Sequence, residues 1–407
     1  MAIQVMKFGG TSVANIIRIK NIAKIIEREV KINKNKLIVV VSAMSGVTNR
    51  LIEDYKKVKY KTSDPEYDVI LSTGEQHSAA IISSLLNEKK IQSRSILGWQ
   101  IPITTDSNYS KARILKINSE LIKKLLKKYK VLVVAGFQGI SEDNRITTLG
   151  RGGSDTSAVA IAYSLGLKSC QIYTDVDGIF TSDPKIVKNA SKIDSITYEE
   201  ILELASLGSK VLHPRSVELA MKYGIKIHVR SSFKRKIGTM VVKEENKIEK
   251  EVVTGITSSE NESKITLKGI PDKPGIAGKI FGILAKVNIN VDMIVQNITD
   301  DGKFASLTFT VPIEDERRAV TELRMSKIKF KNLDAKNSLC KISIVGVGMK
   351  SNVGVAKKMF ETLALKNINI LVISTSEIKI SVLIDLKKKK NSTKRPSSCL
   401  RFKKVTQ

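Results

Sequence analysis

The residue types best suited to chemistry in this chain lie in four short segments rich in glycine, hydroxyl and charged side chains. The first, residues 7–12 (KFGGTS), places Lys7 beside Gly9 and Gly10. Glycines let the backbone approach a ligand closely, and N–H groups at a helix start attract anions, so the segment suits a phosphate group. It lacks the Gly-Lys-Ser/Thr ending of a P-loop. By itself, a Gly-Gly turn fits a simple tight connection equally well.

The second segment, residues 148–157 (TLGRGGSDTS), combines three glycines with Arg151, Asp155 and several hydroxyl groups. An arginine binds a carboxylate through two parallel hydrogen bonds. Asp155 precedes a helix expected over Ala158–Leu165. Its side chain would either cap that helix or take part in a site. So many polar groups next to apolar runs favour a functional loop.

The third segment, residues 173–185 (YTDVDGIFTSDPK), brings three aspartates after a strand end. It is either an Asp-rich turn or a contact to a nucleotide or Mg²⁺, since hard cations take oxygen ligands. The fourth, residues 74–78 (GEQHS), heads a helix expected over Ala79–Leu86. A glutamate at a helix start is electrostatically favourable, and Glu75 is equally suited to hold the ammonium of an amino acid.

Together the four segments supply phosphate-approaching loops, an anion-binding arginine and acidic side chains. Phosphoryl transfer depends mainly on positioning and on neutralising charge, which such groups provide. The three histidines share no metal-ligand spacing, and no G-x-S-x-G nucleophile motif is present.

The elements that must position these segments alternate between strand and helix over the first 250 residues. Apolar residues recur at helix spacing from Ile19 to Val30. Short β-branched runs predict strands over Ile3–Phe8, Leu37–Val41, Val131–Ala135, Gln171–Thr174 and Lys226–Val229. This alternation predicts an α/β fold with a mostly parallel sheet, in which ligands bind beyond the carboxyl ends of the strands.

An internal repeat follows a mixed-charge stretch over Lys243–Glu251. Residues 265–294 match residues 344–373 without a gap. Each copy shows the pattern of a strand, a glycine-containing turn, an amphipathic helix, an Asn-rich turn and a strand, which indicates a duplicated small domain. In the first copy a strand over Phe304–Val311 and a helix over Glu314–Met325 are expected to follow.

Composition limits the class of protein. The 407 residues include 69 Lys and Arg against 40 Asp and Glu, a formal net charge of +29. Such a surplus fits nucleic acid or a membrane surface, or a composition drawn from A/T-rich codons; with aromatics at 5%, we expect no specific nucleic-acid partner. The sequence shows no long apolar run and no secretory signal. Three scattered cysteines fit a reducing cytoplasm.

The ordered motifs KFGGTSVAN (7–15), STGEQHSAAI (72–81), TTLGRGGSDTSAVAIA (147–162) and YTDVDGIFTSDPKIV (173–187) together resemble aspartate kinase. The repeat resembles the paired ACT regulatory domains of that family. The resemblance implies a three-layer α/β/α amino-acid-kinase domain with a mostly parallel sheet, followed by two α+β, ferredoxin-like ACT domains.

The resemblance also implies a reaction, in which ATP with Mg²⁺ phosphorylates the side-chain carboxylate of L-aspartate. This is the first step toward lysine, threonine and methionine. By motif, Lys7 and Asp155 would be catalytic, and no protein metal ligand is implied. The residues implied to bind ATP are Lys7, Gly9, Gly10, Thr11, Thr174, Asp175 and Lys210. Those implied to bind aspartate are Thr48, Glu75, Arg151 and Ser154.

The ACT pair implies allosteric feedback by lysine, threonine or both, and assembly into a homodimer or a larger oligomer. We expect the two ACT copies to form two small half-open sheets, each with an exposed edge for pairing. The residues implied to contact the effector are Asp272, Pro274, Gly275, Ile276, Ala277, Asn290, Asp292 and Gln296.

The expected domain boundaries are a kinase domain over 1–240, a linker and edge strand over 241–262, ACT domains over 263–335 and 336–386, and a basic tail over 387–407. The second ACT copy departs from the family after an expected strand over Ile378–Leu383. Nine basic residues and Pro396 occupy the tail, where a helix is expected. It is either a divergent, disordered end or the product of a frameshift at the run of lysines. An alternative to the enzyme is a catalytically silent amino-acid sensor.

Overall fold

The computed structural model describes residues 2–58, 64–206, 211–244, 252–300, 302–350 and 352–386. Its chain divides into two compact units, one formed by residues 1–180 and 192–246 and the other by residues 181–191 and 247–407. Lys210, most of the stretch 243–251 and the whole basic tail lie outside the described residues. None of the helices in the described ranges has the length and apolar character that a membrane crossing requires.

An eight-stranded, mostly parallel sheet forms the centre of the first unit, in the order β10-β12-β11-β9-β1-β2-β6-β3. Only the β11–β12 pair is antiparallel. The predicted α/β class is therefore confirmed, and all five predicted strands are present. The strands are β1 (Ile3–Phe8), β2 (Lys36–Val41), β3 (Ser93–Ile96), β6 (Val131–Ala135), β9 (Ser169–Thr174), β10 (Ser195–Thr197), β11 (Lys226–Ser231) and β12 (Thr239–Val242).

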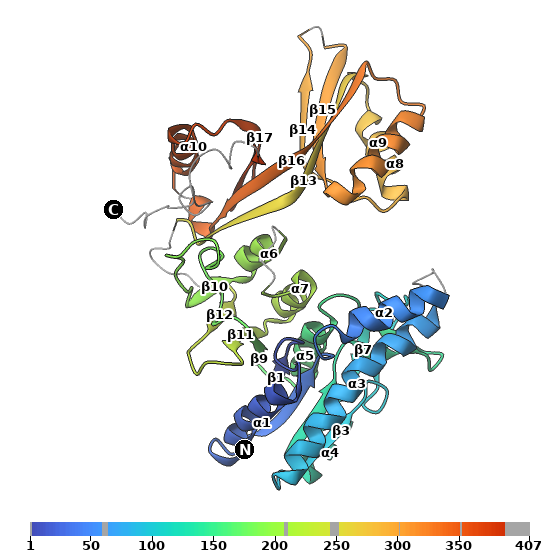
Figure 1. Ribbon diagram of the computed structural model, residues 1–407, viewed down its shortest axis with the longest axis vertical. Helices are drawn as coiled ribbons and strands as arrows, with labels where there is room; N and C mark the ends of the chain where they lie inside the picture. Colours follow the sequence, from blue (N-terminus) through green and yellow to red (C-terminus); the bar gives the residue numbers. More distant parts are fainter. Residues whose placement is uncertain are drawn as a thin grey trace. The chain divides into compact units, whose positions relative to one another are not determined.

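Helices α1 (Ile16–Lys31) and α3 (Pro65–Glu88) lie side by side over one face of this sheet (Figure 1). The predicted apolar face of α1 is buried from Ile19 to Ile26, against Met6, Phe8 and alternate residues of β2 and β6. Because side chains alternate along a strand, Lys7 points to the other face, where α5 (Gly153–Ser164) packs on β1, β2 and β9. The remaining helices are α2 (Val47–Val58), α4 (Ser119–Lys128), α6 (Tyr198–Ser206) and α7 (Pro214–Tyr223).

The carboxyl ends of the central strands are in register. Phe8 pairs with Val41 on one side and with Tyr173 on the other, and Val41 pairs with Ala135. Strand β1 also lies where the strand order reverses direction, between β2 and β9. In open α/β sheets this switch point is where ligands bind, so the loop after β1 is in the expected position for a site.

Two predicted helix starts are wrong. Glu75 does not head a helix over Ala79–Leu86; it lies inside α3, which begins at Pro65 with Asp64 as its cap. Gly74 also lies inside α3. A Cβ at this position would lie 2.8 Å from Cβ of Ala43, so a close packing contact requires glycine. Helix α5 likewise begins at Gly153 instead of Ala158, so Ser154 and Asp155 belong to its first turn.

A small four-stranded sheet lies beside this framework in the same unit, and the sequence did not predict it. Its order is β5-β4-β7-β8. Each strand has only three or four residues, too few for a periodic pattern. They are β4 (Ile103–Thr105), β5 (Ile114–Ile117), β7 (Gln138–Ile140) and β8 (Ile146–Thr148). Strand β8 matters for the site because it leads directly into the Arg151 loop.

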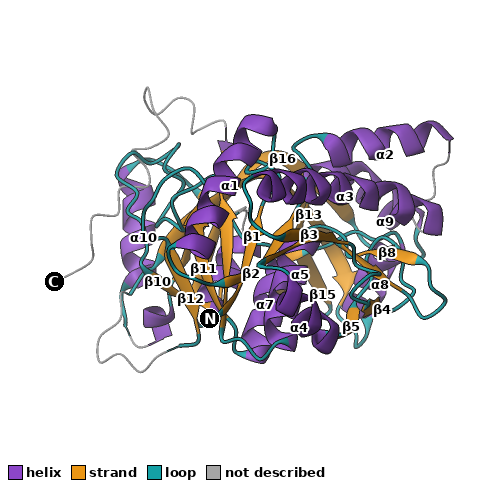
Figure 2. Ribbon diagram, turned by 90° about the horizontal axis from the view of Figure 1, so that it is seen from below, coloured by secondary structure: helices purple, strands orange, loops and turns teal. Residues whose placement is uncertain are grey.

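The second unit contains one antiparallel sheet in the order β14-β15-β13-β16-β18-β17, instead of the two separate sheets expected. Its strands are β13 (Gly255–Pro271), β14 (Asp292–Ile298), β15 (Phe304–Val311), β16 (Asn332–Val345), β17 (Ile370–Thr375) and β18 (Lys379–Asp385). Figure 1 labels β13 to β17, and Figure 2 labels β13, β15 and β16. The two repeats share a sheet because β13 and β16 are long enough to pair across both, from Gly255 with Val345 to Lys268 with Asn332. The second half thus takes its fourth strand from residues 255–259, which precede the first half in sequence.

The helices of the two repeats begin in the same way. Gly275 and Gly354 hold left-handed φ angles of +86° and +91°, directly before α8 (Ile276–Lys286) and α10 (Val355–Leu365). Other residues adopt this conformation only with strain, which explains the shared glycine. Helix α9 (Glu316–Met325) follows a short 3₁₀ turn in the first half and packs beside α8.

A buried lysine joins the two halves of this sheet. Lys341 on β16 is 6% exposed, and its Nζ lies 2.8 Å from Glu262 on β13 and 2.7 Å from Asp292 on β14. A buried charge is tolerated only when it is paired and hydrogen-bonded, so each member depends on the others.

We expect Lys341→Met to lower the free energy of unfolding of the second unit by about 3 kcal/mol or more, because Glu262 would remain buried without its cation. Lys336→Met on the same strand is the matched control. Lys336 pairs with Asp385 at 2.9 Å but is half exposed, so its loss should cost less than about 1 kcal/mol. Urea unfolding of the full chain measures both; equal costs would contradict this account.

Candidate functional site

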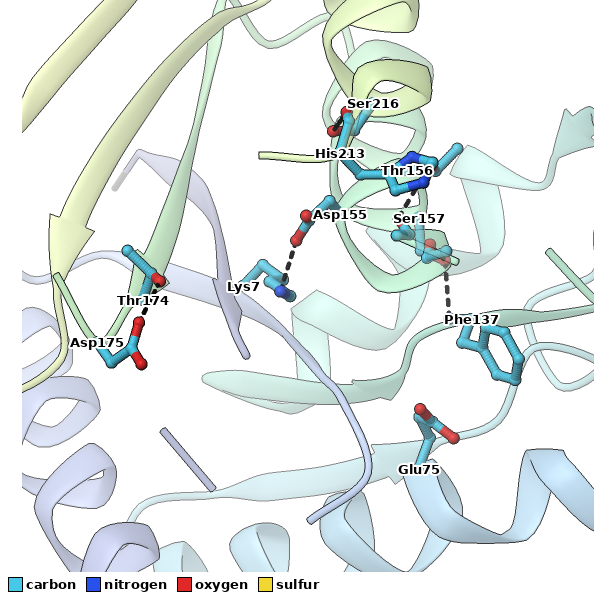
Figure 3. Close-up of polar contacts among 12 residues, drawn as sticks. Lys7, Glu75, Phe137, Asp155, Thr156, Ser157, Thr174, Asp175, His213 and Ser216 are labelled. Atoms are coloured by element: carbon cyan, nitrogen blue, oxygen red, sulfur yellow. Dashed lines mark hydrogen bonds and ion pairs between the residues drawn. The ribbon is translucent and has the colours of Figure 1, made fainter. Parts of the chain in front are cut away.

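A buried ion pair occupies the carboxyl edge of the main sheet. Nζ of Lys7, on β1, lies 2.5 Å from Oδ1 of Asp155 in the first turn of α5 (Figure 3). Both residues are less than one-tenth exposed. The motif that starts at Lys7 and the motif that contains Asp155 are therefore in direct contact, although nearly 150 residues separate them.

The two glycines after β1 pass close to neighbouring backbone. The N–H of Gly9 donates to the carbonyl of Tyr173 at the end of β9. A Cβ at Gly10 would lie 3.1 Å from the carbonyl oxygen of Ala43. Thr11 is exposed beside them. The loop thus lies between the ends of β2 and β9, with the Lys7 ammonium next to Gly9, an arrangement that suits an anionic group.

Glu75 is a buried carboxylate with one oxygen unused. Its Oε1 accepts from the N–H of Ala43 at 3.0 Å, whereas Oε2 is buried and has no hydrogen-bond partner in the part of the chain that the structure describes. Burial raises the pKa of Glu75 to about 7, although the Ala43 N–H and the charge of Lys7 oppose the shift. In Figure 3 its side chain extends from α3 toward the strand ends. A buried acceptor of this kind favours a cationic ligand.

The Arg151 loop connects β8 to α5. Arg151 is exposed and makes no hydrogen bond or ion pair within the described part of the chain, so its guanidinium is free to bind an anion. Ser154 is buried and packs against Gly136 at the end of β6, where a Cβ would lie 2.8 Å from Cβ of Ser154. Thr48 is half-buried in the first turn of α2.

On the other side of β1, Thr174 ends β9 and Asp175 follows it. The Thr174 hydroxyl donates to the Asp175 carboxylate at 3.1 Å, and Asp175 is exposed. A chain of hydroxyl groups connects this turn to the glycine loop: Ser12 donates to Ser232 at 2.9 Å, and Ser232 donates to the Thr174 carbonyl at 3.0 Å. The structure thus places Lys7, Glu75, Asp155 and Thr174–Asp175 at one edge, and it does not describe Lys210.

Sequence reasoning missed two charged residues that hold the Arg151 loop. Asp68 on α3 is fully buried and accepts hydrogen bonds from the backbone N–H groups of Ser110 and Thr148 and from the Thr148 hydroxyl. Burial raises its pKa, opposed by these hydrogen bonds. Arg215 on α7 donates to the carbonyls of Leu149 and Ala112. A single charged residue in a helix has no pattern that reveals such partners; the only signal was a polar side chain on an apolar face.

The residues expected to contact an effector gather around the start of α8 and along β14. Gln296 donates to the Asp272 carboxylate at 3.4 Å, so these two segments are adjacent. Asp292 is already paired with Lys341. Pro274, Gly275 and Asn290 are exposed, and Ile276 and Ala277 are half-buried.

Among the described residues, no group of three His, Cys, Asp or Glu side chains is placed to hold a metal ion. Asp175 offers an exposed carboxylate, whereas Asp177 lies within 3.2 Å of Lys234 and 3.8 Å of Lys236. These residues fit a magnesium ion that is bound mainly through the phosphates of a nucleotide and has few protein ligands.

Family models match most of the chain. The amino acid kinase family matches residues 2–231, and two ACT domain models match residues 265–324 and 342–395. The chain is 46% identical to an aspartate kinase of Stutzerimonas stutzeri, over 95% of this chain and 94% of that protein. It is 47% identical to an aspartate kinase of Pseudomonas putida with the same coverage. The solved structure of E. coli aspartokinase III in complex with aspartate and ADP superposes with a TM-score of 0.78 and 25% identity, over 98% of this chain and all of that one.

The unusual pKa of Glu75 predicts a pH-dependent stability. Because the folded pKa of about 7 exceeds the usual 4.5, the folded state retains a proton that the unfolded state loses. The stability is full below pH 4.5 and is lost as the pH rises through 7. Urea unfolding at several pH values should show that the wild type loses about 3 kcal/mol over this range relative to Glu75→Gln. Parallel curves for the two proteins would contradict the assignment.

Proposed function

Because the chain belongs to the aspartate kinase family, we propose that it transfers the terminal phosphoryl group of ATP to the side-chain carboxylate of L-aspartate, forming 4-phospho-L-aspartate and ADP. The observation that carries this proposal is the buried Lys7 beside the glycine loop, paired with Asp155. The E. coli relative of similar fold binds aspartate and ADP, the acceptor and a product of the proposed reaction.

Lys7 is the proposed centre of the reaction. Both reactants are anions, since the aspartate carboxylate is ionised at neutral pH and the phosphoryl group bears negative oxygens. No strong base is needed, but the charge that develops during transfer must be stabilised. The Lys7 ammonium supplies that charge, and Asp155 positions it before ATP enters.

The aspartate side of the site follows from the free polar groups. The unpartnered Oε2 of Glu75 would accept from the substrate ammonium, and the exposed guanidinium of Arg151 would bind a carboxylate in a fork. Thr48 and Ser154 would complete this side. A buried carboxylate and an arginine without a partner among the described residues together match the ammonium and a carboxylate of an amino acid.

The nucleotide side would be formed by the loops after β1 and β9. Gly9, Gly10 and Thr11 would approach the phosphates, and Thr174 with Asp175 would contact the nucleotide. Lys210 remains a predicted contact from outside the described residues. Mg²⁺ would enter with ATP and neutralise phosphate charge. The exposed carboxylate of Asp175 is the protein group that would contact this ion.

The ACT domains support feedback regulation. We propose that lysine, threonine or both bind around Asp272–Ala277 and Asn290–Gln296 and lower the activity, and that the chain works as a dimer or a larger assembly. The reaction would then be the first step toward lysine, threonine and methionine in the cytoplasm. We also propose the domain boundaries expected from the sequence, with the kinase domain over residues 1–240 and the ACT domains over 263–335 and 336–386.

An assay of ADP release with aspartate, glutamate and acetylglutamate, each with and without lysine or threonine, tests the function. We expect turnover with aspartate. Lys7→Met should lower kcat about 100- to 1000-fold. Because it also leaves Asp155 without its counter-ion, kcat is compared only once circular dichroism shows that the variant is folded. Lys123→Met on α4, which removes an exposed pair with Glu120, is the control and should keep full activity. A chain that binds lysine or threonine but releases no ADP would instead be an amino-acid sensor.

The pH profile of kcat/KM for aspartate provides a separate check on Glu75. Below pH 7 the carboxyl is protonated and no longer offers a charge to the ammonium, so kcat/KM should fall, approaching about tenfold per pH unit. The value of kcat/KM for ATP should not share this step. An aspartate profile that is flat between about pH 6 and pH 8, each about one unit from that pKa, would remove Glu75 from the proposed site.

A further inference from the structure

The buried carboxylate of Asp68 has no counter-ion among the described residues; its partners are hydrogen-bond donors of two distant segments. The N–H of Ser110 lies 2.9 Å from both of its oxygens. The N–H of Thr148 lies 2.6 Å from Oδ2, and the Thr148 hydroxyl lies 2.8 Å from Oδ1. Burying an ionised group is costly unless such donors compensate, so the apolar interior alone would not favour an aspartate here.

Both segments that Asp68 holds lead to the Arg151 loop. Thr148 is the last residue of β8, three residues before Arg151. Ser110 has a left-handed φ of +67°, which a residue with a side chain adopts only with strain. Its carbonyl oxygen would lie 3.0 Å from a Cβ at Gly150, so the 110–112 segment packs directly on the loop. Ala112 also donates to the Thr148 carbonyl at 2.9 Å.

Arg215 holds the same two segments from another helix. Its Nη2 donates to the Ala112 carbonyl at 2.6 Å, and its Nη1 donates to the Leu149 carbonyl. Asp68 on α3 and Arg215 on α7 therefore hold the same pair of neighbouring segments. Asp68 accepts from their N–H groups, and Arg215 donates to their carbonyl groups. Among the described residues the Arg151 side chain has no hydrogen bond or ion pair, so its position depends on how the backbone of its loop is held.

We propose that Asp68, supported by Arg215, is a positioning residue that holds the Arg151 loop and thereby sets the affinity for the amino-acid substrate, an inference that rests on the proposed function. Side chains that bind substrate must be held in place by supporting contacts, because small displacements cause large losses. Asp68 does not touch the nucleotide loops, which are joined instead through Ser12 and Ser232. The effect of Asp68 should therefore be selective for aspartate over ATP.

The test compares three variants with the wild type. Asp68→Asn keeps the volume but presents an N–H₂ group to one of the N–H donors, and it should raise KM for aspartate at least about tenfold. Thr148→Val removes only the hydroxyl donor and should raise KM for aspartate about threefold. In both, KM for ATP should change less than about twofold, below the loss expected for one net hydrogen bond. Ser12→Ala, the matched control, removes a buried hydrogen bond on the nucleotide side and should raise KM for ATP alone.

Hydrogen–deuterium exchange over residues 148–153 gives a readout that does not need activity. Exchange there should be faster in Asp68→Asn than in Ser12→Ala. Equal rises in both KM values, or a lower melting temperature with unchanged KM for aspartate, would show a merely structural role and overturn the proposal. If Asp68→Asn does not fold, an unchanged KM in Thr148→Val overturns it. A wild type without aspartate turnover defeats the proposed function, whereas unchanged exchange defeats this inference.

Discussion

The buried ion pair between Lys7 and Asp155 is the constraint on which the first unit depends. Lys7 reaches the α5 face only because β1 alternates its side chains, with Met6 and Phe8 filling the opposite core. Asp155 reaches Lys7 only because α5 begins at Gly153. The preceding residue must be Gly152, since a Cβ there would lie 2.2 Å from the His213 side chain. An uncompensated charge at either position would be costly in a site so little exposed, so this ion pair constrains how the first turn of α5 lies on β1.

The site separates two kinds of polar contact. Some groups are left unused by the fold, such as Oε2 of Glu75 and the guanidinium of Arg151, and these suit a ligand with both a cation and an anion. Others are fully used by the fold, such as the carboxylate of Asp68, and these hold backbone in place. Both kinds occur on the same helix, since Asp68 and Glu75 lie on α3, and only the three-dimensional contacts distinguish them.

Sequence reasoning was sufficient where the signal is local. The strands β1, β2 and β6 are apolar runs bounded by polar loops, and the glycine loops lie at their ends as expected. Sequence reasoning failed where the residue type is determined by a contact with a distant part of the chain. Gly74 looks like part of a helix start, but glycine is needed there because the chain packs against Ala43, more than 30 residues away. Asp68 with Thr148, and Lys341 with Glu262, join positions about 80 residues apart, and no periodicity encodes such pairs.

The shared sheet of the second unit also has a consequence for the order in which the chain is made. Residues 255–259 leave the ribosome before any of the first repeat, but their partners, residues 341–345, follow roughly 90 residues later. At about 5–20 residues per second, this strand waits some 5 to 20 seconds for its neighbour. The first repeat can form in the meantime, because residues 263–271 of β13 pair with β15, which follows only about 40 residues later. A newly made chain therefore holds an unpaired strand edge during synthesis, and the second repeat closes only after residues 379–385 have emerged.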